Sequence, residues 1–233
     1  NFYKAHQSKL LKSDASIADH EKIAREFHAK HEAKLNEHID AIKAMAPANA
    51  EIEARAKPVG NALEKLARKP YYGDVTHLGD GSGVRVIVDS LDEVKSVVGK
   101  AKAKFKVIEE DNYIDTPKDN YRSHHLVFTG LHGLSVELQV RTQRQNTIAH
   151  ATHSAIYKPS TPEQFAILKA RGHEVAAYYR ALSDYGYKLD KGEKADPPKM
   201  PDFMRGHFKD VTEQVTIGPS RLREDHARFF KMD

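Results

Sequence analysis

The chain of 233 residues contains no cysteine and no tryptophan. The lack of cysteine excludes disulfides, zinc–thiolate sites and thiol nucleophiles. No apolar run reaches the roughly 20 residues that a helix needs to cross a bilayer, and no secretory signal pattern opens the chain. The Walker A sequence and the signatures of protein kinases are also missing, so any nucleotide site in this chain must be of another kind.

The composition is typical of a soluble globular protein, with 39% hydrophobic and 30% charged residues. The formal net charge is +4 and the pI is about 9.0, which fits polyanionic ligands such as nucleotides without requiring them. Neither an internal repeat nor a domain boundary stands out. Because the first residue is Asn1 and not Met, we expect the chain to be a piece of a longer protein.

Hydrophobic periodicity predicts one α/β (α+β) domain with a mixed sheet of four or five strands, flanked by helices and preceded by a long N-terminal helix. The predicted helices cover residues 14–46, 48–69 (restarting near Pro58), 90–103, 143–157 and 162–185. The predicted strands cover residues 84–89, 104–109, 123–129 and 134–142, the last two forming a hairpin. A flexible loop is expected over residues 190–201.

The segment Leu134–Thr142 alternates without a fault between apolar and polar residues. Alternate residues of a strand face opposite sides of the sheet, so one face is apolar and the other carries Glu137, Gln139 and Arg141 about 7 Å apart. A carboxylate, an amide and a guanidinium in a row suit a site that binds a polyphosphate and a metal.

Three further clusters carry groups suited to nucleotide chemistry. The first cluster could bind an anion or form a solvated basic helix face, and it consists of Arg55, Lys57, Asn61, Lys65 and Arg68. Asp80 lies on a glycine-rich loop that leads into the strand containing Arg85, and it is either a Mg²⁺ ligand or a turn residue. The loop 111–125 interleaves tyrosines with cations, which favours base stacking and phosphate neutralisation.

Histidines are numerous but do not form a metal motif. His150 and His153 share one helix face with Tyr157, but no third ligand stands at a suitable spacing, so zinc is not expected. The N-terminal histidines are interpreted as helix-packing or surface residues, namely His20, His28, His31 and His38.

Five motifs follow one another from Arg55 to Lys158: RAK with a later Lys, DGSGVRVIV, NYIDTPK followed by YRSHH, VELQVRT, and H-x-x-x-YK. In order and spacing they resemble the synthetase domain of the RelA/SpoT family, which makes the alarmones (p)ppGpp. The resemblance implies a nucleotidyltransferase-like fold and a single synthetase domain over residues 1–233. Its catalytic part would cover about 48–160, with a C-terminal helix and tail over 162–233.

The resemblance also implies an activity: transfer of pyrophosphate from ATP to the 3′-hydroxyl of an acceptor nucleotide, with release of AMP. Asp80 and Glu137 would bind Mg²⁺, and Glu137 would also act as base, with Gln139 and Arg141 ordering the phosphates. The donor ATP would be bound by Arg55, Lys57, Lys65 and Arg85. The acceptor would be bound by Lys118, Tyr121, Arg122, His125, Asn146 and Lys158.

Departures from the family pattern bear on the acceptor. The loop Pro117–Ser123 is one residue short and lacks the usual glycine, Ile148 replaces an aromatic residue, and Thr152 replaces a glutamate. An adenine acceptor, giving (p)ppApp, therefore becomes credible. Relatives of this kind include a toxin injected by type VI secretion, so we expect a growth-inhibiting toxin that acts in the cytoplasm of a target cell.

Such a toxin would have an immunity protein as partner, and neither a membrane nor DNA is expected as a partner. The alternatives are a (p)ppGpp synthetase that uses GDP or GTP, the same chemistry on a tRNA 3′ end, or an inactive nucleotide-binding module. Alarmone hydrolysis is not expected, because the His-Asp dipeptide of the family's hydrolase domain is missing.

Overall fold

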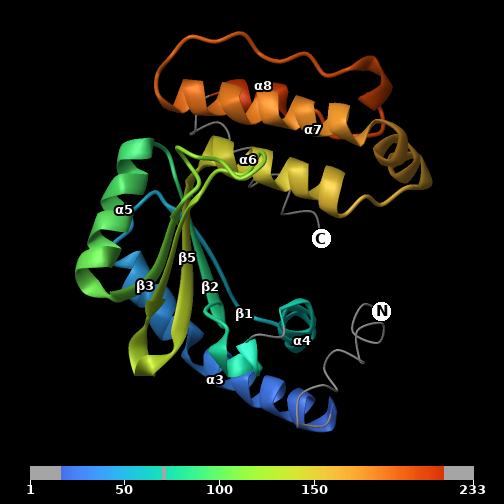
Figure 1. Cartoon of the computed structure of the whole chain (residues 1–233). Helices are drawn as coiled ribbons and strands as arrows, with labels where there is room; N and C mark the ends of the chain where they lie inside the picture. The colour runs from blue at the N-terminus through green and yellow to red at the C-terminus, as the bar shows by residue number, and fades with distance from the viewer. Residues whose placement is uncertain (1–16, 70–71, 218–233) are drawn as a thin grey trace. The chain divides into compact units, whose positions relative to one another are not determined.

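The computed structural model of the chain describes residues 17–69 and 72–217. It contains a five-stranded sheet with the strand order β1-β2-β5-β4-β3 (Figure 1). The predicted α/β fold, with about five strands flanked by helices, is confirmed, as is the predicted hairpin, because β4 and β5 are neighbours. The strands are β1 (Glu51–Ala56), β2 (Ser82–Val88), β3 (Lys106–Asn112), β4 (His124–Thr129) and β5 (Ser135–Thr142).

The long N-terminal helix is confirmed as α3 (Ile17–Lys43), although predicted residues 14–16 lie outside the described part. Two later helices begin at threonine caps: Thr142 accepts a hydrogen bond from the backbone of Gln145, and Thr161 accepts one from the backbone of Gln164. The remaining helices are α4 (Val59–Arg68), α5 (Leu91–Lys104), α6 (Gln143–Thr152), a π-helical turn (His153–Tyr157), α7 (Pro162–Asp190) and α8 (Thr212–Thr216).

The predicted helix over 48–69 is wrong in its first half, because residues 51–56 form strand β1. Glutamate, alanine and arginine favour helices, so local propensity points to a helix here. Pro58 disfavours a helical conformation at Lys57, and pairing with β2 decides the outcome for the preceding residues. The backbone N–H of Lys57 bonds to the carbonyl of Gly81, 2.8 Å away, which extends this pairing to the Asp80 loop.

The chain divides into two compact units. Of the described residues, unit 1 comprises 17–69 and 72–86 together with Val97–Glu110 and His125–Gln139. Unit 2 comprises Ile87–Ser96, Asp111–His124 and 140–217. The expectation of a single synthetase domain over 1–233 stays a prediction.

In unit 1, α3 packs against β1 and α4 (Figure 1). The apolar residues Ala24 and Phe27 of α3 share a core with Leu63 and Leu66 of α4 and with Leu78. Three of the four N-terminal histidines, His20, His31 and His38, are buried, which agrees with their interpretation as packing residues.

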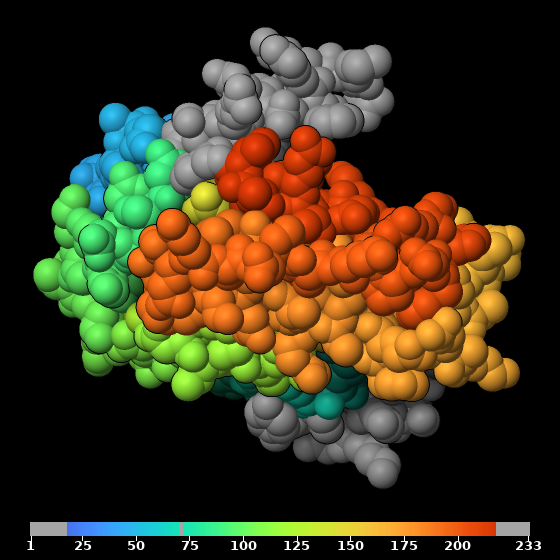
Figure 2. All heavy atoms as spheres, turned by 90° about the horizontal axis from the view of Figure 1, so that it is seen from above, coloured from blue at the N-terminus to red at the C-terminus, as the bar shows by residue number. Residues whose placement is uncertain are grey.

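In unit 2, the core is built by α6, α7 and the chain after α7. Residues 193–201 have no regular secondary structure, as expected for the loop, but Met200 is buried against this core. Figure 2 shows the chain that follows α7 lying against that helix, and Met204, Phe208 and Val215 supply its buried contacts. Of the helices in 17–69 and 72–217, none combines the length and apolarity that spanning a membrane demands.

Candidate active site

Asp80 lies between two ammonium groups in unit 1. Its Oδ2 is 2.7 Å from Nζ of Lys57, which follows β1, and 2.9 Å from Nζ of Lys65 on α4. Burial alone raises the pKa of Asp80, but the hydrogen bonds and charges of the two lysines outweigh it, and the pKa lies below its ordinary value. Asp80 is therefore ionised at neutral pH, in a cradle of cations drawn from two elements.

Glu137 occupies the polar face of β5, as the alternation predicts, because its neighbours Val136 and Leu138 are fully buried. Gln139 Nε2 donates to Glu137 Oε2 at 2.9 Å, and His125 Nδ1 lies 3.6 Å from Oε1. Burial raises the pKa of Glu137, but His125 and Gln139 lower it by more, so the group stays ionised despite the nearby Asp80.

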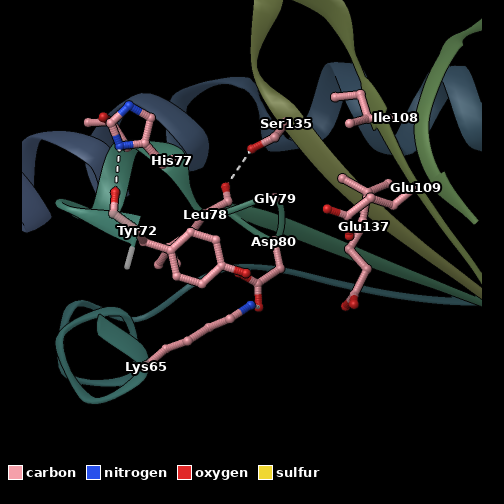
Figure 3. Close-up of a pocket in the computed structure, with 12 residues that line it drawn as sticks. Lys65, Tyr72, His77, Leu78, Gly79, Asp80, Ile108, Glu109, Ser135 and Glu137 are labelled. Carbon is pink, nitrogen blue, oxygen red and sulfur yellow. Dashed lines mark hydrogen bonds and ion pairs between the residues drawn. The ribbon is translucent and has the colours of Figure 1, made fainter. Parts of the chain in front are cut away.

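The two carboxylates and Lys65 line one cavity of about 210 Å³ in unit 1. In Figure 3, Lys65 extends toward Asp80, and Asp80 and Glu137 present their carboxylates to the same side. The rest of the wall is mixed in character and includes Tyr72, His77, Ile108, Glu109 and Ser135.

The donor set of this cavity fits Mg²⁺. The second oxygen of Asp80, Oδ1, is buried and has no hydrogen-bond partner. Within residues 17–69 and 72–217 no group of three or more His, Cys, Asp or Glu side chains could hold a metal. Two carboxylates that need substrate phosphates to complete the coordination are what Mg²⁺ usually finds in a nucleotide site.

A hydrogen-bonded series leads from Glu137 to β1. The Gln139 amide donates to Glu137 and accepts at 3.2 Å from Arg85 Nε, while Arg85 also pairs with Glu53. Arg55 is exposed two residues after Glu53, so strand alternation puts both on the same face of β1. Arg55 and Arg85, both predicted to bind the donor ATP, thus belong to neighbouring strands. Glu53 is a partner that sequence reasoning missed.

Helix α3 supports the loop that carries Asp80. His31 Nδ1 lies 2.8 Å from Ser82 Oγ, and the ring of His31 packs against that of Phe27 with centroids 4.4 Å apart and planes tilted by 55°. A Cβ at Gly81 would lie 2.2 Å from His31 Nε2, so only glycine fits this close approach. The helix also reaches the cation cradle, since His28 Nδ1 is 3.1 Å from the carbonyl of Lys57.

The predicted acceptor residues Lys118 and Tyr121 belong to unit 2 and form the ends of a tight turn. The N–H of Tyr121 bonds to the carbonyl of Lys118 at 3.0 Å. The family pattern has a glycine in this loop, which the chain lacks. Asp119 in the shortened loop adopts a φ of +57°. Aspartate tolerates this left-handed conformation better than most residues, so the shortened loop closes without a glycine.

Arg141 and Asn146 are both buried in unit 2 and bonded to each other, with Arg141 Nη2 2.5 Å from Asn146 Oδ1. The Arg141 guanidinium lies over the ring of Tyr121, 5.8 Å from its centroid. The structure therefore places Arg141 with two predicted acceptor residues, Asn146 and Tyr121. The resemblance, in contrast, implies that Arg141 orders phosphates beside Glu137.

The other predicted acceptor residues are dispersed. His125 lies beside Glu137 in unit 1, and Lys158 is exposed in unit 2 at the end of the π-helical turn. Arg122 is buried and bonded to α7. The replaced positions Ile148 and Thr152 are buried as well, and Ile148 belongs to the core of unit 2.

The sequence profile described as "Region found in RelA / SpoT proteins" matches residues 54–162. Residues 54–162 thus match the RelA/SpoT family, a stretch of just under half of the chain. The match begins in β1 and includes every predicted site residue from Arg55 to Lys158, so the resemblance inferred from the five motifs is confirmed.

RelA/SpoT relatives with known names include the GTP pyrophosphokinase of Photobacterium angustum, which is 30% identical over 128 residues. That match covers 54% of this chain but only 16% of the relative. Among solved structures, the small alarmone synthetase 1 of Bacillus subtilis bound to its product pppGpp is 25% identical with a TM-score of 0.58, over 73% of this chain and 94% of that one. The type VI effector Tas1, solved with its immunity protein, matches at 18% identity with a TM-score of 0.42, over 89% of this chain and 95% of that one.

Proposed function

We propose that the chain is an ATP-dependent nucleotide 3′-pyrophosphokinase that transfers pyrophosphate from ATP to an adenosine nucleotide and makes (p)ppApp. The observation that carries this proposal is the shared cavity of Asp80 and Glu137, two ionised carboxylates beside the ammonium of Lys65. The names of the relatives, GTP pyrophosphokinase and alarmone synthetase, support the reaction class.

The residues of unit 1 suit the donor half of this reaction. Arg55 and Arg85 offer guanidinium planes for the adenine of ATP, and Lys57 and Lys65 offer ammonium groups for its phosphates. Both lysines pair with the Asp80 carboxylate in this structure, and a bound triphosphate can replace that carboxylate as the partner of either lysine. Asp80 and Glu137 would hold Mg²⁺, which when bound neutralises the oxygens of the β- and γ-phosphates.

Glu137 suits the role of base because it is ionised and held from both sides by Gln139 and His125. The 3′-hydroxyl of the acceptor gives its proton to the Glu137 carboxylate, and the oxygen attacks the β-phosphorus of ATP. The bond from that phosphorus to the oxygen it shares with the α-phosphate breaks, and AMP leaves. Such transfers are catalysed mainly by positioning and by neutralising charge.

The residues of unit 2 suit the acceptor. Tyr121 offers a ring for base stacking, and the exposed Lys118 and Lys158 offer cations for phosphates. We base the preference for adenine on the loop between Lys118 and Tyr121, which is one residue shorter than in the family pattern and is closed by Asp119. A guanine acceptor or a tRNA 3′ end would use the same donor chemistry.

The decisive test is the identification by mass spectrometry of the products formed by the purified chain from ATP and Mg²⁺ with ADP, ATP, GDP or GTP, and separately with labelled tRNA. We expect AMP and a 3′-pyrophosphorylated adenosine nucleotide. Glu137→Gln should abolish both, while Glu109→Gln should retain them, because Glu109 is an exposed carboxylate on another wall of the same cavity. Nucleotide binding without AMP release by the wild type would contradict the proposal.

We also propose that this activity serves as a growth-inhibiting toxin acting in bacterial cytoplasm, with an immunity protein as its partner. With an adenine acceptor, both nucleotides consumed in each turnover are adenine nucleotides, so the reaction drains the pool that drives biosynthesis. Induced expression in a bacterial host should arrest growth, Glu137→Gln should not, and co-expression of the partner should restore growth. Unimpaired growth with an active, well-expressed wild type would contradict this role.

A further inference from the structure

The acceptor-binding loop of unit 2, residues 113–123, is fastened to helix α7. Arg122 near the end of this loop is buried, and it uses each of its terminal groups within unit 2. Its Nε donates to Ser183 Oγ at 3.2 Å, its Nη2 to Asp184 Oδ1 at 2.7 Å, and its Nη1 to the carbonyl of Ile114.

Tyr187 completes the attachment, one helical turn after Ser183. The guanidinium of Arg122 lies over the Tyr187 ring, 4.3 Å from the ring centroid. The Tyr187 hydroxyl donates to Asp115 Oδ1 at 2.7 Å, so α7 contacts the loop at both its start and its end. Tyr187 stands four residues after Ser183 and three after Asp184, and residues at these two spacings are neighbours on a helix surface, which explains how α7 reaches both points.

Helix α7 is itself rigidly held. The residues next to the contact surface, Tyr179 and Leu182, are fully buried in the core of unit 2, and Tyr185 is 5% exposed. The loop is therefore attached to an element that cannot easily move. The resemblance implies that Arg122 neutralises acceptor phosphates or frames the pocket. Three of the five N–H groups of its guanidinium are committed within unit 2, and the residue is only 6% exposed, so framing the pocket suits it better than contact with a phosphate.

We propose that Ser183, Asp184 and Tyr187 are positioning residues that set the shape of the acceptor-binding loop through Arg122 and Asp115. Arg122 then serves the acceptor by holding Tyr121 and Lys118 in place, not by touching a phosphate. The expected change in KM rests on the proposed function. The expected change in the mobility of the loop rests only on the contacts within unit 2.

The substitution Asp184→Ala separates the two roles of Arg122, because they predict opposite changes. If Arg122 is a phosphate ligand, Asp184→Ala removes the carboxylate that competes for its guanidinium, so the anionic acceptor should bind more tightly. If α7 positions the loop, the KM for ADP or GDP at saturating ATP should instead rise about threefold to tenfold, the range expected for one partly exposed hydrogen bond to a charged group. The KM for ATP should not change.

Two further variants sharpen the experiment. Glu163→Ala removes an exposed carboxylate from the same helix, away from the loop, and should leave both KM values unchanged. Tyr187→Phe keeps the ring beneath Arg122 but loses the bond to Asp115, so it should raise the KM for the acceptor by a smaller factor than Asp184→Ala. A KM for the acceptor that falls or stays the same in Asp184→Ala would overturn the inference.

Amide hydrogen exchange tests the same inference without any activity. In Asp184→Ala the amides of residues 113–123 should exchange faster than in the wild type, while those of Glu163→Ala should not. Unchanged exchange in the loop would overturn the positioning role even if the chain is an active enzyme. Faster exchange in a chain that releases no AMP would uphold it while the proposed function fails.

Discussion

Gln139 Nε2 donates a hydrogen bond of 2.9 Å to Glu137 Oε2, and the oxygen of the same amide accepts from Arg85. One side chain thus orients both the proposed base and an arginine proposed to bind ATP. Because an amide offers a donor and an acceptor at once, no other residue of this size can replace it without losing one of the two bonds.

Gln139→Leu should lower kcat about tenfold to a hundredfold, the effect of losing a hydrogen bond to a charged group, and should raise the KM for ATP. Glu53→Gln is the matched control, since it weakens only the other partner of Arg85. It should raise the KM for ATP and leave kcat unchanged. Steady-state kinetics with varied ATP distinguish the two, and a kcat of Gln139→Leu within twofold of the wild type would refute the orienting role.

The sequence determines the strand that carries Glu137 better than any other element. Its alternation predicts both the strand and the exposed face, because a half-buried strand requires period two. The error at Glu51–Ala56 has the opposite cause, since that segment contains good helix formers and becomes a strand only through pairing with β2.

The partners of the site residues were harder to predict than the residues themselves. Distant segments supply Glu53, His31 and Asp184, each of which contacts a predicted site residue or its loop from 32 or more residues away along the chain. Nothing in local periodicity reports such contacts. The burial of Arg141 and Arg122 was missed for the same reason, because a polar residue on a strand face or in a loop is expected to meet solvent unless a distant helix covers it.

Gly81→Ala should destabilise the chain by about 1–3 kcal/mol, as overpacking does in well-packed sites. The added methyl group would lie 2.2 Å from His31 Nε2 and 2.6 Å from the Phe27 ring, and His31 cannot swing away while its other nitrogen is bonded to Ser82. Gly83→Ala is the control, because no atom lies within 4 Å of its Cβ. Urea unfolding should show a lower midpoint for the first variant only, and equal midpoints would contradict the close packing of the Asp80 loop on α3.

Arg144→Ala should cost about 3–5 kcal/mol of stability, because it leaves the buried carboxylate of Asp190 without its cation. Arg144 Nη1 lies 3.0 Å from Asp190 Oδ1, whose side chain is 1% exposed. Burial already raises the pKa of Asp190, against the opposing effect of Thr142 and Arg144. Lys95→Ala, which breaks an exposed pair with Asp92, should change the free energy of unfolding little. Similar losses in the two variants would show that the Arg144 pair contributes no more than a surface contact.

The stability of the chain should fall as the pH decreases from 6.5 to 4, and His31 should account for much of the loss. Burial, together with the neighbouring His38, lowers the pKa of His31 from 6.5 to about 4. Between these values the unfolded chain binds a proton that the folded chain does not, so acidification favours unfolding. The interval corresponds to about 3 kcal/mol, and this stabilisation is fully present only above pH 6.5.

His31→Gln provides the comparison, because the amide can still bond to Ser82 but does not titrate. The variant should be less stable than the wild type at pH 7, and the difference between the two free energies of unfolding should shrink by up to about 2.5 kcal/mol at pH 4.5. His38, whose pKa is also lowered by burial, remains in both proteins, so the effect of its own burial cancels from the difference and only its interaction with His31 is lost. Denaturant titrations at half-unit pH steps measure this difference. If the free energies of unfolding of the two proteins fall in parallel with pH, His31 does not titrate in this range.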